Sequence, residues 1–74
     1  MLIPRRSLNP TDWAKCVQNG WIALDPKTGA TLRKSPVNTG ANHTQSQYFL
    51  YIPNLMVIVI WAMTDVEAIA IANH

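Results

Sequence analysis

Nucleophilic catalysis by this chain would depend on Cys16, the single cysteine, activated by one of two histidines, His43 or His74. A cysteine nucleophile needs a base within hydrogen-bond reach, and that base needs a third group to orient it. His43 lies in a polar stretch and His74 is the last residue, so the spacing brings neither histidine to Cys16. Cys16 falls on the apolar side of an expected helix, and a small core residue explains it better than a nucleophile.

Metal binding and acid–base catalysis have no better support. A zinc site takes three or four Cys, His or carboxylate ligands with local spacing, and this sequence contains no such group. Asp65 and Glu67 stand at the start of an expected helix, where negative charge suits the helix dipole and where positions i and i+2 diverge. The three glycines are isolated, so there is no glycine-rich phosphate loop. We therefore expect no enzyme, no metal and no cofactor.

More residues support anion binding than support catalysis or metal binding. Residues 1–34 hold six basic and two acidic residues, a net charge of +4, whereas residues 35–74 hold only two acids, a net charge of −2. Basic side chains contact phosphates and aromatic rings stack on bases. The candidate anion-binding residues are Arg5, Arg6, Arg33 and Lys34, with Trp13, Trp21 and Tyr48 as stacking surfaces. No signature of a nucleic-acid-binding module accompanies them, so nucleic acid is a less favoured partner.

The composition describes a small, apolar, folded chain. Its 74 residues are 49% hydrophobic and 14% charged, which excludes intrinsic disorder. A chain of this length buries only about 60% of the surface that its unfolded form exposes. Surplus apolar surface must therefore be sheltered by a partner chain, a larger assembly or a bilayer. The start of the chain lacks the apolar run of a secretory signal, and we expect a cytoplasmic protein, with a membrane location as the alternative.

The first half of the sequence predicts an arm, a helix and a hairpin. Residues 1–8 are expected to form an extended basic arm, and residues 9–74 a single small α+β domain. A helix over about 10–18 is predicted because Asn9 suits an N-cap and Gly20 a C-terminal stop. Its apolar stripe is expected to consist of Trp13, Cys16 and Val17. Strands at 21–24 and 30–33 flank the sequence Asp-Pro-Lys-Thr-Gly, which is typical of a hairpin loop.

The second half begins with a polar loop over 35–47 and then becomes strongly apolar. The runs 48–52 and 55–63 are rich in β-branched and aromatic residues and lack polar alternation, which predicts strands buried on both faces. Pro53 cannot start a tight two-residue hairpin, so either a looser turn joins the two runs or Pro53 simply ends the first strand. Thr64 and Glu67 form a capping box, which favours a helix over 65–73, although a strand would also fit its alternating alanines.

Aromatic residues in the apolar runs are the best candidates for contact with a partner, since aromatic side chains anchor interfaces. The candidate partner-binding residues are Tyr48, Tyr51 and Trp61, although a core position would also suit Trp61. Phe49, Val57 and Val59 are expected in the core.

These patterns favour a non-enzymatic protein-interaction module that is homo-oligomeric or a small subunit of a larger assembly, so its partner is itself or another protein. The first alternative is a single-span membrane protein with the span near 53–72. That window includes Asp65 and Glu67, each of which costs about 2.5–3.5 kcal/mol near the centre of a span. The second alternative is a weak nucleic-acid binder that uses the basic N-terminal half.

Overall fold

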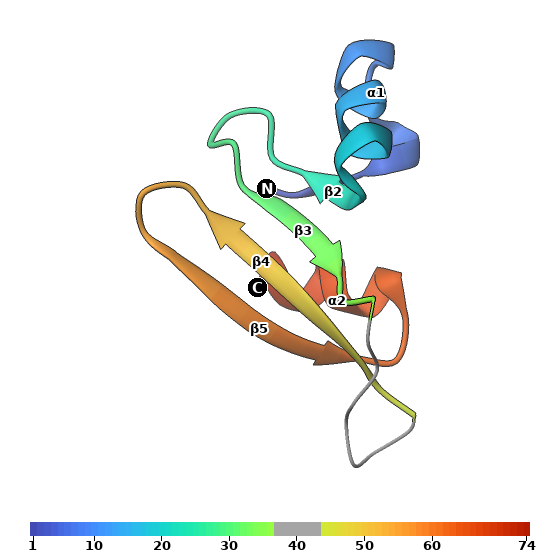
Figure 1. The fold of residues 1–74 in the computed structure, drawn as a ribbon, viewed down its shortest axis with the longest axis vertical. Coiled ribbons are helices and arrows are strands. Elements are labelled where there is room, and N and C mark those ends of the chain that lie inside the picture. The colour runs from blue at the N-terminus through green and yellow to red at the C-terminus, as the bar shows by residue number, and fades with distance from the viewer. Residues whose placement is uncertain (37–43) are drawn as a thin grey trace.

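The chain folds into an antiparallel meander in which each strand pairs with the next one along the sequence (Figure 1). The computed structural model describes residues 1–36 and 44–74. The elements are β1 (Ile3–Pro4), a 3-10 turn η1 (Arg5–Ser7), α1 (Pro10–Asn19), β2 (Trp21–Leu24), β3 (Thr31–Lys34), β4 (Ser46–Ile52), β5 (Met56–Ala62) and α2 (Asp65–Ala72). Within the described residues, two α-helices and five strands confirm the predicted α+β class.

Local signals set the ends of both helices. The Asn9 side chain accepts a hydrogen bond from the Asp12 N–H at 2.9 Å, and Gly20 ends α1 in the left-handed region at φ 74. The Thr64 hydroxyl accepts from the Glu67 N–H at 3.1 Å, which begins α2. Both caps satisfy backbone donors that a helix leaves unpaired at its first turn. The predicted helix at the C-terminal end is confirmed.

The stripe expected on the first helix is only partly buried. Cys16 is fully enclosed, but Trp13 and Val17 are 47% and 49% exposed. The helix packs against β2 and η1 at one margin of the sheet. The helix therefore docks through Cys16, while Trp13 and Val17 stay largely exposed.

Two turns connect the hairpins. In the β2–β3 loop the Gly29 N–H donates to the Asp25 carbonyl at 2.8 Å with Gly29 at φ 79, which confirms the predicted hairpin. In the β4–β5 loop the Leu55 N–H donates to the Ile52 carbonyl at 3.1 Å, and Asn54 has φ 62. Proline followed by a left-handed residue is the pattern of a type II turn. The prediction from Pro53, that the turn is looser than a two-residue hairpin loop, is confirmed.

The N-terminal residues do not form a free arm. Residues Ile3 and Pro4 add a short strand beside β2. Leu2 exchanges two hydrogen bonds with the Asn73 side-chain amide, at 2.7 and 3.0 Å. The Met1 ammonium group forms an ion pair with Asp25 at 2.8 Å. The expected extended arm over 1–8 is therefore corrected: backbone pairing and these long-range contacts hold it in the fold.

The two faces of the sheet differ in how far other elements pack over them. The inner face packs against α2, and its core includes Leu32, Tyr48, Leu50 and Ile60 together with Ala68 of the helix. The outer face carries the alternate residues, because successive side chains of a strand point to opposite sides. In Figure 1 α2 lies behind the sheet, while α1 sits beside β2, away from β5. Most of the expected loop over 35–47 (residues 37–43) is outside the described residues.

Candidate functional site: the edge strand β5

Strand β5 pairs with β4 on one side, and no strand of the described chain pairs with it on the other. Its ladder with β4 is regular over seven residue pairs, from Ser46–Ala62 to Ile52–Met56. An edge strand presents unpaired N–H and C=O groups that can template the addition of another strand. The geometry therefore leaves a seven-residue edge open to pairing.

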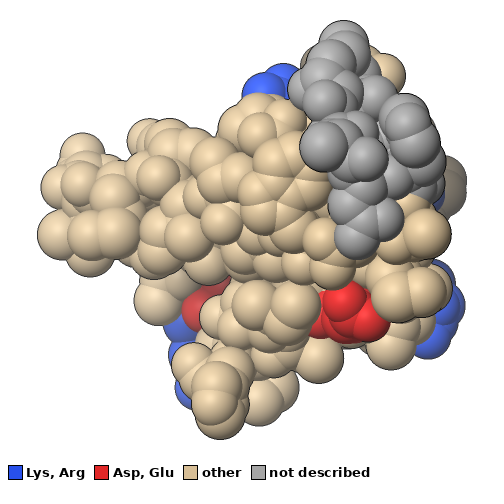
Figure 2. Space-filling model, turned by 90° about the horizontal axis from the view of Figure 1, so that it is seen from below, with Lys and Arg blue, Asp and Glu red and all other residues tan. Residues whose placement is uncertain are grey.

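The side chains of this strand are apolar and exposed on the outer face. Alternate residues of β5 point to this face, and the residues just before and just after the strand continue the same alternation. Each of these side chains is between 40% and 75% exposed. These five outer-face residues are Leu55, Val57, Val59, Trp61 and Met63. Figure 2, seen from below the view of Figure 1, shows a mostly uncharged surface with acidic side chains in its middle and basic side chains at its margins.

The inner face of the same strand is only half covered. Ile60 and Ala62 are buried beneath α2, at 6% and 0% exposure. Met56 and Ile58, nearer the hairpin turn, are 55% and 37% exposed. The strand therefore presents apolar side chains on both sides of its open edge.

This exposure corrects the expected burial of residues 55–63 on both faces, including the core positions of Val57 and Val59. Two facts of long-range structure explain it. The meander places β5 at the end of the sheet, and α2 covers only the inner face. Phe49, one strand further in, is partly buried, as a residue with neighbours on both sides should be. The apolar run marks a surface where the sequence predicted a core.

The opposite edge of the sheet differs in every respect that matters for strand pairing. Strand β1 is two residues long and ends in Pro4, which has no N–H to donate. The Asn73 amide occupies both the N–H and the carbonyl of Leu2. Short strands, proline and covering groups are the devices by which proteins protect sheet edges. Strand β5 has none of them, and the sequence from Leu55 to Met63 has no charged residue.

Of the three predicted partner-binding residues, Tyr51 and Trp61 lie on the surface, at 49% and 40% exposure. Their contact with a partner stays a prediction. The prediction that Tyr48 contacts a partner is wrong, because its side chain is fully buried on the inner face. Its hydroxyl donates to Asp65 Oδ1 at 2.6 Å. Burial and the neighbouring carboxylate of Asp65 raise the pKa of Tyr48 well above its usual value of 10. It anchors α2 to the sheet.

The four candidate anion-binding residues do not form one patch. Arg33 and Lys34 are adjacent on β3 and so point to opposite faces of the sheet. The Arg33 guanidinium lies 5.7 Å from the centre of the Phe49 ring, on the outer face. Arg5 donates from Nη1 to the Trp21 carbonyl at 3.5 Å. The predicted stacking surface at Tyr48 is buried. The structure therefore separates the residues that the sequence grouped by charge.

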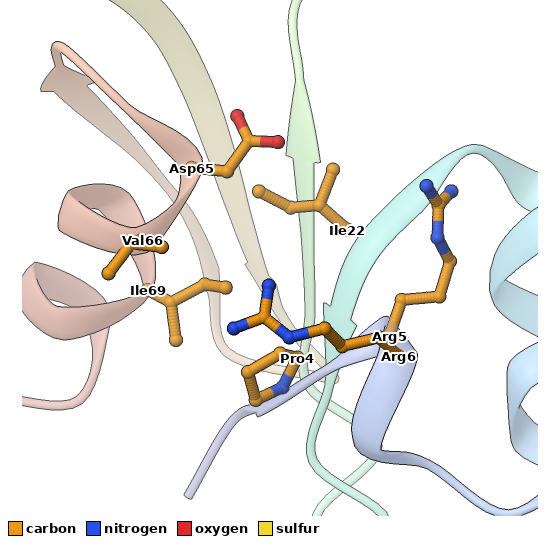
Figure 3. A pocket seen from close by; sticks show the side chains of 7 residues that line it. All are labelled: Pro4, Arg5, Arg6, Ile22, Asp65, Val66 and Ile69. Atoms are coloured by element: carbon orange, nitrogen blue, oxygen red, sulfur yellow. The ribbon is translucent and has the colours of Figure 1, made fainter.

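A cavity of about 330 Å³ opens between the N-terminal segment and α2. It is lined by Pro4, Arg5, Arg6, Ile22, Asp65, Val66 and Ile69, and Figure 3 shows one arginine side chain reaching toward the helix and the other turned away. The Asp65 carboxylate that borders it already accepts the Tyr48 hydroxyl. The cavity brings basic and acidic groups together with apolar walls, and no single ligand chemistry follows from it.

Of the residues that the sequence offers for covalent chemistry, the structure describes Cys16 and His74. Cys16 is a free, buried thiol, and burial raises its pKa above the usual value. His43 is outside the described residues. Over residues 1–36 and 44–74 no group of three or more His, Cys, Asp or Glu side chains could hold a metal ion. No helix in the same ranges has the length and apolar character needed to cross a bilayer. Residues 53–72 form a turn, β5 and α2 rather than one helix.

No protein-family model, curated protein or solved structure matches this chain.

Proposed function

We propose that the protein is a non-enzymatic protein-interaction module that works by self-association, with the open edge of β5 as its docking element. The observation that carries the proposal is the exposure of Val57, Val59 and Trp61, at 59%, 47% and 40%, on an edge strand without a charged residue. Contiguous exposed apolar surface of this kind marks interaction sites in folded proteins.

Strand addition explains why both the backbone and the side chains of β5 are available. An added strand takes up the unpaired N–H and C=O groups, and its side chains pack beside the apolar residues of β5 on each face. Burial of apolar surface stabilises such a pair by about 25 cal/mol for each Å² removed from water. A strand of a different subunit would pair with the same edge, so the edge of β5 would also attach the protein to a larger assembly.

We also propose that the protein is cytoplasmic. Cys16 is a free thiol, and free thiols are the usual state of cysteine in a reducing compartment. The site offers no grouping of nucleophile, base and oxyanion donor, and the proposal assigns no reaction to it.

Light scattering coupled to size-exclusion chromatography tests self-association. We expect the mass to rise above the monomer value of 8.3 kDa as concentration increases. Val57→Lys should return the protein to the monomer, because it places a charge beside the open edge. Val17→Lys is the matched control, since Val17 is exposed to a similar degree on α1. It should associate as the wild type does.

A monomer of 8.3 kDa at every concentration overturns the proposal. So does association that Val17→Lys abolishes and Val57→Lys leaves intact, because the interface would then lie on α1. Circular dichroism of both variants confirms that each retains its helices and strands before the masses are compared.

A further inference from the structure

We propose that the strand which pairs with β5 is β5 of a second copy, in an antiparallel register with Val59 on the two-fold axis, and that assembly stops at a dimer. This inference rests on the proposed function and adds the partner, the register and the number of copies.

The difference between the two sheet edges limits assembly to two copies. A chain of molecules that grows head to tail needs two complementary edges on each molecule. Here β1 is short and ends in proline, and Leu2 just before it is bonded to Asn73, whereas no strand among the described residues lies beyond β5. A molecule with one usable edge can pair only with the same edge of a second molecule. That isologous contact uses up both edges and closes the assembly.

The two-fold axis fixes which residues face each other. A two-fold axis perpendicular to the sheet makes neighbouring strands antiparallel and keeps each face continuous, so one residue of β5 must lie opposite its own copy. Val59 is the midpoint of Met56–Ala62, and an axis there pairs all seven residues of the strand. Moving the axis to Ile58 or Ile60 leaves two residues of each strand without a partner.

This register also matches side chains by size. Val57 lies opposite the large Trp61 of the second copy, Met56 opposite the small Ala62, and Ile58 opposite Ile60. Directly opposed apolar pairs of this kind contribute about 0.2–1 kcal/mol each relative to alanine pairs. No charged residue lies within the paired segment, so no like charges are opposed in it.

The acidic residues that follow β5 favour the antiparallel direction. Asp65 and Glu67 stand just beyond the C-terminal end of the strand. In the antiparallel pair the two acidic groups lie at opposite ends, about 24 Å apart for seven residues of extended chain. A parallel pair would bring four carboxylates together at one end, where like charges repel one another.

The size of the interface predicts a reversible dimer. A standard interface removes about 800 Å² from each partner, which is about a sixth of the 5015 Å² surface of this protein. One added strand falls toward the small end of the range, below about 1,200 Å² in total, where association is weak. The dimer should therefore form and dissociate with concentration.

Disulfide trapping tests the register in the full chain. Directly opposed residues of antiparallel strands have Cα atoms about 4.5–5.5 Å apart, within the 4.4–6.8 Å range that a disulfide bridges. Val59→Cys should cross-link to its own copy when oxidised glutathione accepts the two electrons of the thiol pair. Val57→Cys is the matched control, because its two copies would lie about 14 Å apart. The double variant Val57→Cys with Trp61→Cys should cross-link again.

Buried Cys16 is an internal control, because the wild type should give no cross-linked species under the same conditions. We expect Val59→Cys to form the covalent dimer at least ten times faster than Val57→Cys. Equal or faster cross-linking of Val57→Cys overturns the register, and covalent or scattering species larger than a dimer overturn closure. Light scattering before oxidation separates these outcomes from failure of the proposed function, in which neither variant associates at all.

Discussion

The Tyr48 hydroxyl donates a 2.6 Å hydrogen bond to Asp65, which connects the middle strand of the β3–β4–β5 ladder to the first residue of α2. Tyr48 is fully buried, whereas Asp65 is exposed at the start of α2. This bond holds α2 against the inner face. The helix thereby covers Ile60 and Ala62 but leaves the outer side of β5 open.

Replacement of Tyr48 by phenylalanine should destabilise the fold. Hydrogen bonds to charged groups contribute about 1.5–3 kcal/mol, and the lower end applies because Asp65 is exposed to solvent. Urea unfolding should therefore show a loss of about 1.5 kcal/mol in the free energy of unfolding. Tyr51→Phe, at a half-exposed tyrosine on the outer face, is the control and should change it by less than about 0.5 kcal/mol. Equal losses in both variants would contradict the anchoring role.

The same tyrosine predicts a weakening of the fold at alkaline pH. The pKa of Tyr48 is raised in the folded state above its usual value of 10, because burial and Asp65 disfavour the tyrosinate. Its contribution to stability is therefore complete below pH 10 and declines as the pH rises above it. Thermal melts from pH 8 to pH 11 should show a falling midpoint in the wild type. A fall of the same size in Tyr48→Phe would assign the effect to other groups.

Asp25 predicts a corresponding loss at acid pH. The Met1 ammonium group at 2.8 Å and the N–H groups of Lys27 and Thr28 hold the pKa of Asp25 below its usual value of 3.8. Its contribution to stability is present above pH 3.8 and is lost as the pH falls below that value. Asp25→Asn should flatten the stability profile between pH 5 and pH 2. Asp12→Asn, on α1, should leave that part of the profile unchanged; if both behave alike, the hairpin loop is not the acid-sensitive element.

The cap of α2 provides a test of the helix itself. Thr64→Ala removes the hydroxyl that accepts from the Glu67 N–H, and N-cap substitutions of this kind cost about 1 kcal/mol. Thr11→Ala, at an exposed position in the first turn of α1, should have little effect. Denaturant unfolding of the two variants measures the difference. Equal stability would mean that tertiary packing alone sets the start of α2.

Nucleic-acid binding should be absent, because the four basic residues do not lie on one face. Filter binding with a single-stranded oligonucleotide at two salt concentrations checks this expectation. Steep weakening with salt is the mark of phosphate contacts. Binding of that kind, lost when Arg5, Arg6, Arg33 and Lys34 are replaced by alanine, would revive the nucleic-acid alternative.

Signals carried by neighbouring residues predicted the local structure well. Asn9, Gly20 and Thr64 marked helix ends, and the loop from Asp25 to Gly29 marked a hairpin, because each of these signals acts within a single turn of chain. The order of strands in the sheet depends on contacts far apart in the sequence. Patterns of neighbouring residues do not reveal this strand order. For this reason the pairing of β1 with β2 was not predicted.

The candidate site was only half predicted for a related reason. The run from Leu55 to Met63 has no polar residue to show which face meets water, so it resembles a strand buried on both sides. Burial depends on whether another layer covers each face, and the sequence does not encode that layer locally. Tyr48 and Tyr51 show the difficulty: three residues apart on one strand, they point to opposite faces, one into the core and one outward.

Hydrogen exchange at the backbone of β5 tests the central claim most directly. In an edge strand, alternate N–H groups point away from the existing neighbour and should exchange freely in the monomer. As protein concentration rises, we predict that these N–H groups in Met56–Ala62 become at least ten times more protected, while those of α1 do not change. Unchanged, rapid exchange along the open side of β5 at the highest concentration would contradict the claim that a second molecule pairs there.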